Sequence, residues 1–387
     1  MSNVTGYPVA FYGAMIDCEP RMGTYDAALR QAITPGCTVI DIGAGFGVFS
    51  LLACKYGAGH VIAIEPDPSI ELVMPLAKAN GCADRITVVR DMSTNYTPEH
   101  KADVIVSDIR GSSPLFEYNI PTIKDARARL LKPGGTLLPM RDTVRVALVN
   151  SANAHRSSRY PWLSNRYGLD LSGVHSFAVN KQSSVALGLK SMVSEAATLA
   201  VLDYRTITET NVDTTLELVA THDRTAHGLL MWFDAEIAEG LSFSTGPGQP
   251  RMVYGQMFFP LTHAVKMKRG DRLVLRMRAT HSGGGYIWTW DSQFIDQATG
   301  KITRSFNQSS FGSKVYAKDL LKTMSNQYVP EATKMMQVDA DCLALAGEGR
   351  NLDTIAKTML ERHPDAFPSY QQALDRLVSL FERYGRA

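Results

Sequence analysis

The sequence is poor in cysteine and carries no concentrated block of charge. Its five cysteines are an odd number, are scattered, and include no pair at the spacing of metal ligands: Cys18, Cys37, Cys54, Cys82 and Cys342. Neither a disulfide framework nor a metal site is therefore expected. The formal net charge is only +2. Because nucleic-acid binders usually concentrate basic residues on one face, we expect no nucleic-acid partner.

Long apolar runs are also missing, so no segment is expected to span a membrane. The first residues, Met1 to Gly13, lack the charged start and the apolar core that a signal peptide needs. Cysteines without a pairing pattern fit a reducing compartment. These absences together predict a cytoplasmic protein with no membrane partner.

What the sequence does contain is enough apolar material for several cores. The chain has 387 residues, of which 45% are hydrophobic and 20% charged. That length exceeds what one core usually holds, so two or three domains are expected. Changes of pattern along the chain predict N-terminal helices at 1–35, an α/β domain at 36–140, a β domain at 141–315 and a helical unit at 316–387.

The most informative stretch runs from Val39 to Gly47, where a short apolar segment ends in an acid and then turns on Gly43, Gly45 and Gly47. Glycines allow a backbone to turn tightly and a ligand to come close. A second apolar segment ends at Glu65. A carboxylate about 20 residues beyond such glycines can bind both hydroxyls of a ribose. The pattern predicts a nucleoside-binding α/β unit.

The nucleoside that the residues favour is S-adenosylmethionine rather than a dinucleotide. A dinucleotide fold needs a further Gly or Ala for close helix packing, and Val48 occupies that position. Asp41, just ahead of the first glycine, suits an ammonium group better than a diphosphate. Arg21, near the start of an expected helix, can pair with a cofactor carboxylate. The alternatives are a glycine-rich turn that binds no ligand and a solvated arginine.

Strand and helix alternate through residues 37–140. Such alternation indicates a parallel sheet with helices on its faces and ligands at the carboxyl ends of the strands. Strands are expected at 37–42, 60–65, 86–90, 103–107 and 136–139, and helices at 48–56, 68–80 and 119–131, with a turn at 132–135. The loop after the third strand, Asp91, Met92 and Ser93, lies where an adenine would. Asp91 could accept from the adenine amino group and Met92 could pack on the ring, or both could be ordinary loop residues.

Two acids, Asp108 and Glu117, flank the loop after the fourth expected strand. This loop opens on the methyl-donor end of such a pocket. Paired carboxylates can grip a cation through bidentate hydrogen bonds, or one of them can act as a base. Arg110 lies between the two acids in the sequence, and the alternative is that it neutralises Asp108.

From residue 141 the pattern is that of an antiparallel β-sandwich or barrel, with alternating strands between glycine-rich turns. Strands are expected at 143–149, 216–220, 228–237, 252–261, 272–277 and 285–290. The long excursion near 151–195 is typical of a binding or oligomerisation arm. Beyond about 316, three short helices with apolar residues at helical spacing suggest a small winged-helix-like appendage.

Residues 12 to about 295 resemble the protein arginine methyltransferases in the order and spacing of these features. The loop from Ser107 to Glu117 is similar to the double-glutamate loop of that family, and Phe243 to Pro247 with Gln256 resembles the run around its Thr-His-Trp loop. The resemblance implies an α/β Rossmann-like methyltransferase domain followed by an antiparallel β-barrel domain with an inserted helical arm that makes a homodimer. It also implies S-adenosylmethionine as cofactor and S-adenosylhomocysteine as product.

The resemblance also assigns roles to positions of this sequence. Met15 falls near the reactive sulfur and Arg21 on the methionine carboxylate. The full set of expected cofactor residues is Met15, Arg21, Asp41, Gly43, Gly45, Gly47, Glu65, Asp91, Met92 and Ser93. Glu117 and Asp108 take the catalytic positions, and Tyr12 and Tyr254 are expected to bind the acceptor.

Two departures from the family pattern concern the acceptor. The first acid is Asp108 rather than Glu, which shortens its reach, and a guanidinium fork demands fixed geometry. The Thr-His-Trp positions read Met252-Val253-Tyr254, so the histidine is absent, and the position of its aspartate partner is Cys18. Loss of both members indicates a rebuilt acceptor site.

The favoured function is methyl transfer from S-adenosylmethionine to a nitrogen of a guanidine or amine, in a peptide or a small metabolite. The alternatives are an O-methyltransferase that acts on a carboxylate or hydroxyl, and a non-catalytic methyltransferase-like partner subunit. The segment Gly349 to Ala356 is weakly similar to the helical part of leader-peptide-binding winged helices. That similarity implies a peptide partner at the C-terminal unit, and a structural cap is the alternative.

Overall fold

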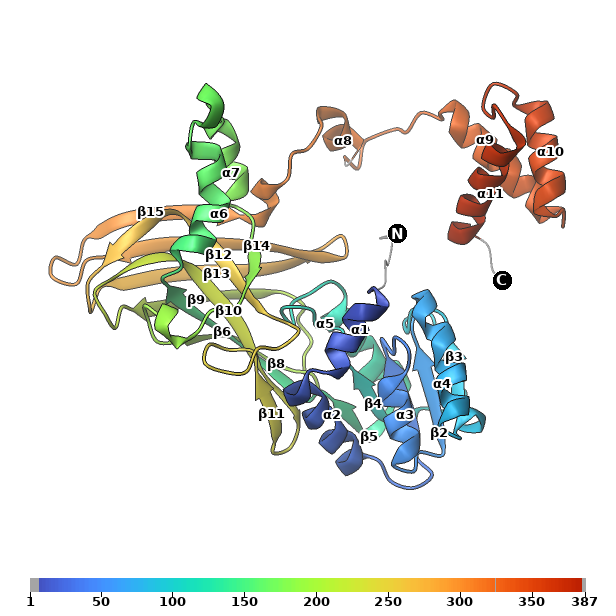
Figure 1. The fold of residues 1–387 in the computed structure, drawn as a ribbon, viewed down its shortest axis with the longest axis horizontal. Helices are drawn as coiled ribbons and strands as arrows, with labels where there is room; N and C mark the ends of the chain where they lie inside the picture. The colour runs from blue at the N-terminus through green and yellow to red at the C-terminus, as the bar shows by residue number, and fades with distance from the viewer. Residues whose placement is uncertain (1–6, 324, 385–387) are drawn as a thin grey trace. The chain divides into compact units, whose positions relative to one another are not determined.

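The computed structural model describes residues 7–323 and 325–384 (Figure 1). The chain forms two compact units, and the boundary between them falls between Val315 and Tyr316. Within the described ranges, no helix combines the length and the apolar character that crossing a membrane requires.

The first half of the larger unit is a five-stranded parallel sheet in the order β3-β2-β1-β4-β5. Its central strands read as nearly continuous apolar runs because helices cover both faces of the sheet. The strands are β1 (Thr38–Ile42), β2 (His60–Ile64), β3 (Ile86–Val89), β4 (Ala102–Ser107) and β5 (Leu131–Leu138). The turn expected at 132–135 lies instead inside β5, whose register against β4 is irregular there.

Helices precede this sheet and connect its strands (Figure 1). The α-helices are α1 (Val9–Ile16), α2 (Glu19–Ala32), α3 (Val48–Lys55), α4 (Val73–Ala79) and α5 (Asn119–Asp125). Shorter helical turns are η1 (Pro68–Leu72), η2 (Ala83–Arg85) and η3 (Ala126–Leu130). Parallel strands need such crossovers, and the alternation in the sequence predicted them.

Two antiparallel sheets make the second half of the larger unit, so the predicted Rossmann-like and β-barrel architecture is confirmed. One sheet has the order β7-β12-β10-β6-β8 with β11 on β10, and the other is β15-β14-β13-β9. The strands are β6 (Arg141–Val149), β7 (Ser183–Val185), β8 (Ala197–Asp203), β9 (Val212–Val219), β10 (Arg224–Ala238), β11 (Leu241–Ser244), β12 (Gln256–Met267), β13 (Arg272–Ser282), β14 (Gly285–Ile295) and β15 (Ile302–Ser309). Strands β7, β8, β11 and β15 were not predicted, and β12 begins four residues later than expected, because 252–255 form a turn.

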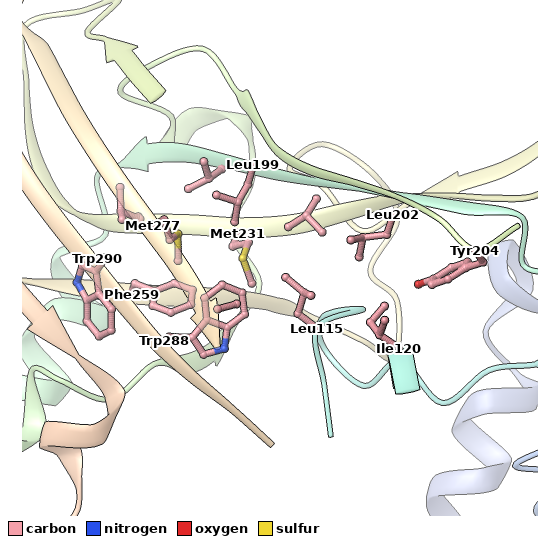
Figure 2. Packing of buried hydrophobic residues seen from close by; sticks show 14 of the residues in the cluster. Leu115, Ile120, Leu199, Leu202, Tyr204, Met231, Phe259, Met277, Trp288 and Trp290 are labelled. Carbon is pink, nitrogen blue, oxygen red and sulfur yellow. The ribbon is translucent and has the colours of Figure 1, made fainter. Parts of the chain in front are cut away.

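The core between these sheets is built around large side chains. Trp288, Trp290, Phe259 and Met231 are at most 2% exposed and lie together in Figure 2. The same cluster reaches the α/β half through Leu115, which belongs to the loop between β4 and α5. The two halves of the larger unit therefore share one continuous core.

The predicted helical insertion is present between β6 and β8. It contains α6 (Ala152–Leu163), α7 (His175–Ala178), and the turns η4 (Arg166–Gly168), η5 (Ser172–Val174) and η6 (Leu189–Ser191). Several of its large apolar side chains are exposed, namely Tyr160, Leu163, Tyr167, Leu169, Leu171 and Val174. A turn, η7 (Ser310–Ser313), follows β15 and ends the larger unit.

The smaller unit is helical, as predicted. It comprises α8 (Lys318–Thr323), α9 (Lys334–Gly347), α10 (Leu352–Arg362) and α11 (Tyr370–Tyr384), and it has its own core around Val338, Ile355, Met359 and Leu377. Its described residues include no strand, so the helices of the expected winged-helix-like appendage are present without a wing.

Candidate active site

The glycine loop lies at the carboxyl end of β1. Gly43, Gly45 and Gly47 have φ values of +73°, +55° and +88°, a region that side chains other than hydrogen disfavour. The backbone N–H of Gly43 donates to the Ile64 carbonyl at 2.9 Å, so the loop turns across the end of β2. A Cβ on Gly45 would lie 2.7 Å from the Tyr12 ring. Close approach and backbone conformation thus both require glycine here.

Glu65 lies at the tip of β2, beside this loop. Its Oε2 accepts from the Gly45 backbone N–H at 3.2 Å, and its Oε1 accepts from the Asp67 N–H at 2.9 Å. Partial burial raises the pKa of Glu65 above its ordinary value. These two hydrogen bonds fix the carboxylate at the sheet edge where the predicted ribose would bind.

Asp41 carries a buried oxygen that pairs with no described residue. The side chain is buried, and its Oδ2 accepts from the backbone N–H of Ser50 at 3.0 Å and from its hydroxyl at 2.7 Å. Its Oδ1 is buried and has no hydrogen-bond partner in the described part of the chain, and the same is true of Ser107 Oγ on the neighbouring strand β4. Burial raises the pKa of Asp41 to about 7. Because buried polar atoms are normally paired, the site fits an ammonium group such as that of S-adenosylmethionine.

Arg21, on α2, points its guanidinium toward the same region. Nε donates to Asp108 Oδ2 at 2.6 Å and to the Tyr254 hydroxyl at 3.2 Å, while Nη1 donates to the Met15 carbonyl at 3.2 Å. Nη2 makes no hydrogen bond within residues 7–323 and 325–384. That nitrogen is therefore free to hold a cofactor carboxylate, and the role predicted for Arg21 stays a prediction that the geometry permits.

The loop predicted to face adenine is largely occupied with its own hydrogen bonds. Asp91 Oδ1 accepts from the Met92 backbone N–H at 2.7 Å and from Asn95 at 2.8 Å. Ser93 is buried, and its carbonyl accepts from Arg129 at 3.0 Å. Asp91 Oδ1 thus shapes the turn, Met92 is half-buried beside it, and the adenine contacts expected of both stay predictions.

Asp108 is not available to an acceptor in this arrangement. Its side chain is 4% exposed. Oδ2 accepts from Arg21 Nε and from the Tyr254 hydroxyl, each at 2.6 Å, and Oδ1 accepts from Nε and Nη2 of Arg110, each at 3.1 Å. A carboxylate offers about four acceptor positions, so all of them are filled. Burial raises the pKa of Asp108, but the two arginines and the hydrogen bonds outweigh burial and lower it. Neutralisation by Arg110, the alternative to an acceptor grip, is the arrangement found.

Arg110 extends these contacts into a buried network. Its Nη1 donates to Asp142 Oδ1 at 2.9 Å and its Nη2 to the Tyr25 hydroxyl at 2.8 Å. Asp142 Oδ2 in turn accepts from the Tyr204 hydroxyl at 2.5 Å. We call the chain Arg21–Asp108–Arg110–Asp142 the buried ion-pair network. Its two positive and two negative charges cancel, and it joins α2, the loop after β4, and β6.

Three residues of the network and its hydrogen-bond partners were not predicted from the sequence: Tyr25, Asp142 and Tyr204. Asp142 did carry a signal, since it shares the buried face of β6 with Val144 and Val146, a position where an acid needs a partner. The two tyrosines carry no local signal.

The two residues expected to bind the acceptor, Tyr254 and Tyr12, both make contacts with other side chains of the protein. Tyr254 is 8% exposed, and its hydroxyl belongs to the network around Asp108. Tyr12 places its hydroxyl 3.1 Å from Ser69 Oγ and its ring edge-on to Phe46, with centroids 5.0 Å apart. Tyr12 therefore covers the glycine loop, on the cofactor side of the site.

Glu117 is the acid that remains available. It is exposed, and its carboxylate makes no hydrogen bond or ion pair to any residue that the structure describes. Partial burial raises the pKa of Glu117, which makes the carboxylate more basic. Its φ of +38° is unusual for a residue other than glycine and costs about 1–3 kcal/mol. Strain of this kind persists where the surroundings enforce it, often at functional sites.

The chain matches two family models. Residues 141–284 match the arginine methyltransferase oligomerization subdomain, and residues 27–138 match the ribosomal protein L11 methyltransferase family. Among relatives, the arginine N(omega)-methyltransferase of Streptomyces achromogenes subsp. streptozoticus is 31% identical over 271 residues, which cover 68% of this chain and 74% of the relative. Protein arginine N-methyltransferase 1 of Schizosaccharomyces pombe is 27% identical over 239 residues, covering 60% of this chain and 70% of the relative.

Solved structures of such proteins share the fold. The Trypanosoma brucei PRMT1 enzyme–prozyme heterotetramer with AdoHcy aligns with a TM-score of 0.71 at 21% identity, over 78% of this chain and 98% of that chain. Arabidopsis thaliana protein arginine methyltransferase 10 aligns with a TM-score of 0.68 at 20% identity, over 78% of this chain and 99% of that chain.

Proposed function

This chain belongs to the arginine methyltransferase family, and from that membership we propose that it methylates a guanidinium nitrogen of arginine or of an arginine-containing peptide or metabolite. It is an S-adenosylmethionine-dependent N-methyltransferase. The observation that supports a cationic acceptor best is the Glu117 carboxylate on the loop after β4, at the same sheet edge as the glycine loop, which is exposed and pairs with no residue in the described part of the chain. A carboxylate is the natural partner of a guanidinium.

The residues that we propose to bind the cofactor lie on one side of this edge. When bound, S-adenosylmethionine supplies a methyl group that its sulfonium activates for transfer. Asp41 Oδ1 would satisfy the ammonium group, Arg21 Nη2 the carboxylate, and Glu65 the ribose hydroxyls. Each of these side chains is already held by hydrogen bonds to its surroundings. Binding of the cofactor would therefore cost little additional side-chain entropy.

On the acceptor side, the available carboxylate would hold N–H groups of the guanidinium and orient one nitrogen for attack. Orientation of this kind supplies much of the rate of a group transfer. Because its pKa is raised, Glu117 can also take the proton that the nitrogen loses after methylation. Asp108 would act indirectly, through Arg21: its Oδ2 accepts a hydrogen bond from Arg21 Nε, which fixes the guanidinium that would bind the cofactor carboxylate.

Glu117→Gln tests this assignment most directly. Labelled S-adenosylmethionine would be offered with free arginine, with arginine-containing peptides, and with a small-molecule extract. We expect the substitution to reduce transfer at least about 100-fold, because the amide can neither balance the cationic acceptor nor take its proton. Affinity for S-adenosylhomocysteine should stay within about 2-fold. Glu239→Gln, an exposed acid in the turn between β10 and β11, is the matched control.

The outcomes separate the remaining alternatives. Label on a guanidine compound, absent with Glu117→Gln, supports the proposal. Label that base removes as a methyl ester indicates an O-methyltransferase instead. No transfer to any acceptor, with tight binding of S-adenosylhomocysteine, would leave the non-catalytic partner subunit.

We further propose that the protein is a homodimer formed through the helical insertion at 151–195. The match to an oligomerization subdomain and the exposed apolar side chains of that insertion support this assembly. Sedimentation of the wild type and of Leu163→Asp would test it. A cytoplasmic location is proposed because all five cysteines are free and buried.

A further inference from the structure

Glu117 contacts a part of the β domain that lies outside the buried ion-pair network. Strands β13 and β14 form a hairpin that turns at Gly283 and Gly284. His281, at the end of β13, places its Nε2 3.0 Å from the backbone carbonyl oxygen of Glu117. Because a carbonyl oxygen can only accept, this ring nitrogen carries the hydrogen.

The neighbour of Glu117 packs on the same hairpin. The Tyr118 and His281 rings meet edge to face, with centroids 5.7 Å apart. The Tyr118 hydroxyl lies so close to Gly284 that a Cβ there would be 2.5 Å from it. Contact with the hairpin thus extends over two consecutive residues, Glu117 and Tyr118, of the loop from Asp108 to Tyr118, which we call the acid loop.

His281 is itself held firmly. Its backbone N–H donates to Asn211 Oδ1 at 2.8 Å, and it lies opposite Tyr286 in the β13–β14 register, with ring centroids 5.2 Å apart. The Tyr286 hydroxyl donates to the Thr210 carbonyl at 2.9 Å. The imidazole is therefore presented by a hydrogen-bonded sheet rather than by a loop that can follow Glu117.

The loop is also anchored on either side of Glu117. Leu115 is 3% exposed and Ile120 is fully buried, and both belong to the core shared with the β sheets, as Figure 2 shows. Only 116–118 lie outside that core and are exposed. A left-handed conformation between two anchored residues can persist if a further contact selects it.

We propose that His281 is a positioning residue for methyl transfer: by donating to the Glu117 carbonyl, it holds Glu117 in the left-handed conformation that directs its carboxylate toward the acceptor. Tyr118 shares this role by packing against His281 and Gly284. The proposal rests on the function proposed for Glu117, and it adds a β-domain element that completes the acceptor side of the site.

This role predicts where a substitution acts. Within the described residues, the hydrogen bonds of Asp41, Glu65 and Arg21 all go to residues outside the hairpin, so cofactor affinity should not change. A displacement of the reacting groups by about 1 Å can reduce a rate about 100-fold. The loss should therefore appear in kcat and in the acceptor KM.

The test compares His281→Ala with His281→Gln, whose side-chain amide can still donate to the carbonyl. We expect His281→Ala to reduce kcat/KM for the acceptor by about 10- to 100-fold, and His281→Gln to recover most of it. S-adenosylhomocysteine affinity and thermal stability should stay near those of the wild type in both. His222→Ala, an exposed histidine in the turn between β9 and β10, is the control.

A second pair of variants, at Tyr118, tests the same contact in case a His281 variant does not fold. Tyr118→Phe keeps the ring contact and should retain activity, whereas Tyr118→Ala should lose it without loss of cofactor binding. Wild-type activity in His281→Ala overturns the inference and leaves the proposed function intact. Equal losses in the Ala and Gln variants also overturn it, because they indicate a role other than the hydrogen bond. An inactive wild type would instead contradict the proposed function.

Discussion

A single carboxylate oxygen, Oδ1 of Asp41, would link the pH dependence of this protein to the binding of its cofactor. Burial raises the pKa of the folded-state carboxyl from 3.8 to about 7. A raised pKa means that the folded chain prefers the protonated acid. The stability that this preference contributes is present below the unfolded pKa and is lost as pH rises through about 7.

The first prediction follows from that shift. Affinity for S-adenosylhomocysteine should increase as pH rises toward about 7 and then level off, because only the ionised Asp41 can pair with the ammonium group. Asp41→Asn should bind more weakly and lose this pH dependence. Calorimetric titration between pH 5.5 and 8.5 would measure both. An unchanged pH profile in Asp41→Asn would show that another group titrates.

The buried ion-pair network is a property of the elements that it joins. Arg110 is 1% exposed and Asp142 is fully buried. Removing one partner of such a pair leaves an uncompensated buried charge, which costs about 3–5 kcal/mol. Removing both partners costs much less, because no charge is left without a partner.

Arg110→Met should therefore lower the free energy of unfolding by about 3–5 kcal/mol, and Asp142→Asn added to it should restore part of the loss. Urea denaturation of the wild type, both single variants and the double variant would measure the coupling. Additive effects would mean that Arg110 and Asp142 do not depend on each other. Arg205→Met, whose partner Asp203 lies in an exposed pair, is a control for the loss of an arginine.

Helix α1 is the other element with a predicted response. None of its residues is buried. Even its apolar side chains are exposed, Val9 to 72% and Ile16 to 45%. Its Tyr12 lies over the glycine loop, so a bound cofactor would be covered by this helix. We expect amide hydrogen exchange in α1 to slow on addition of S-adenosylhomocysteine, with no change in β14. Unchanged exchange in α1 would contradict a covering role.

At the scale of the whole molecule, each compact unit has a core of its own. A chain truncated after Val315 should therefore stay folded, bind S-adenosylhomocysteine and methylate a small acceptor as the full chain does. If the smaller unit binds a peptide partner, the truncation should raise the KM only for peptide acceptors. Circular dichroism and acceptor kinetics of the two chains would measure this. Loss of folding would show that the larger unit needs the smaller one.

Local patterns in the sequence were enough to predict the succession of strands and helices along the α/β half and the sheet edge that carries the expected cofactor residues. These features depend on local patterns: apolar runs of strand length, glycines where φ is positive, and acids at the ends of strands. Strands β8 and β15 escaped prediction because their exposed positions weaken the apolar alternation. The acid loop was also identified, since Asp108 and Glu117 lie close in the chain.

Which of the two acids is left without a partner among the described residues depends on contacts between distant parts of the chain. Asp108 meets Arg21 and Tyr254, and Arg110 meets Asp142, across separations of 87, 146 and 32 residues. Glu117 receives its hydrogen bond from His281, 164 residues away. Such contacts depend on how the β sheets pack against the α/β half, and no local pattern encodes that packing. A carboxylate's availability is set by the donors that the fold brings to it, so it could be settled only in three dimensions.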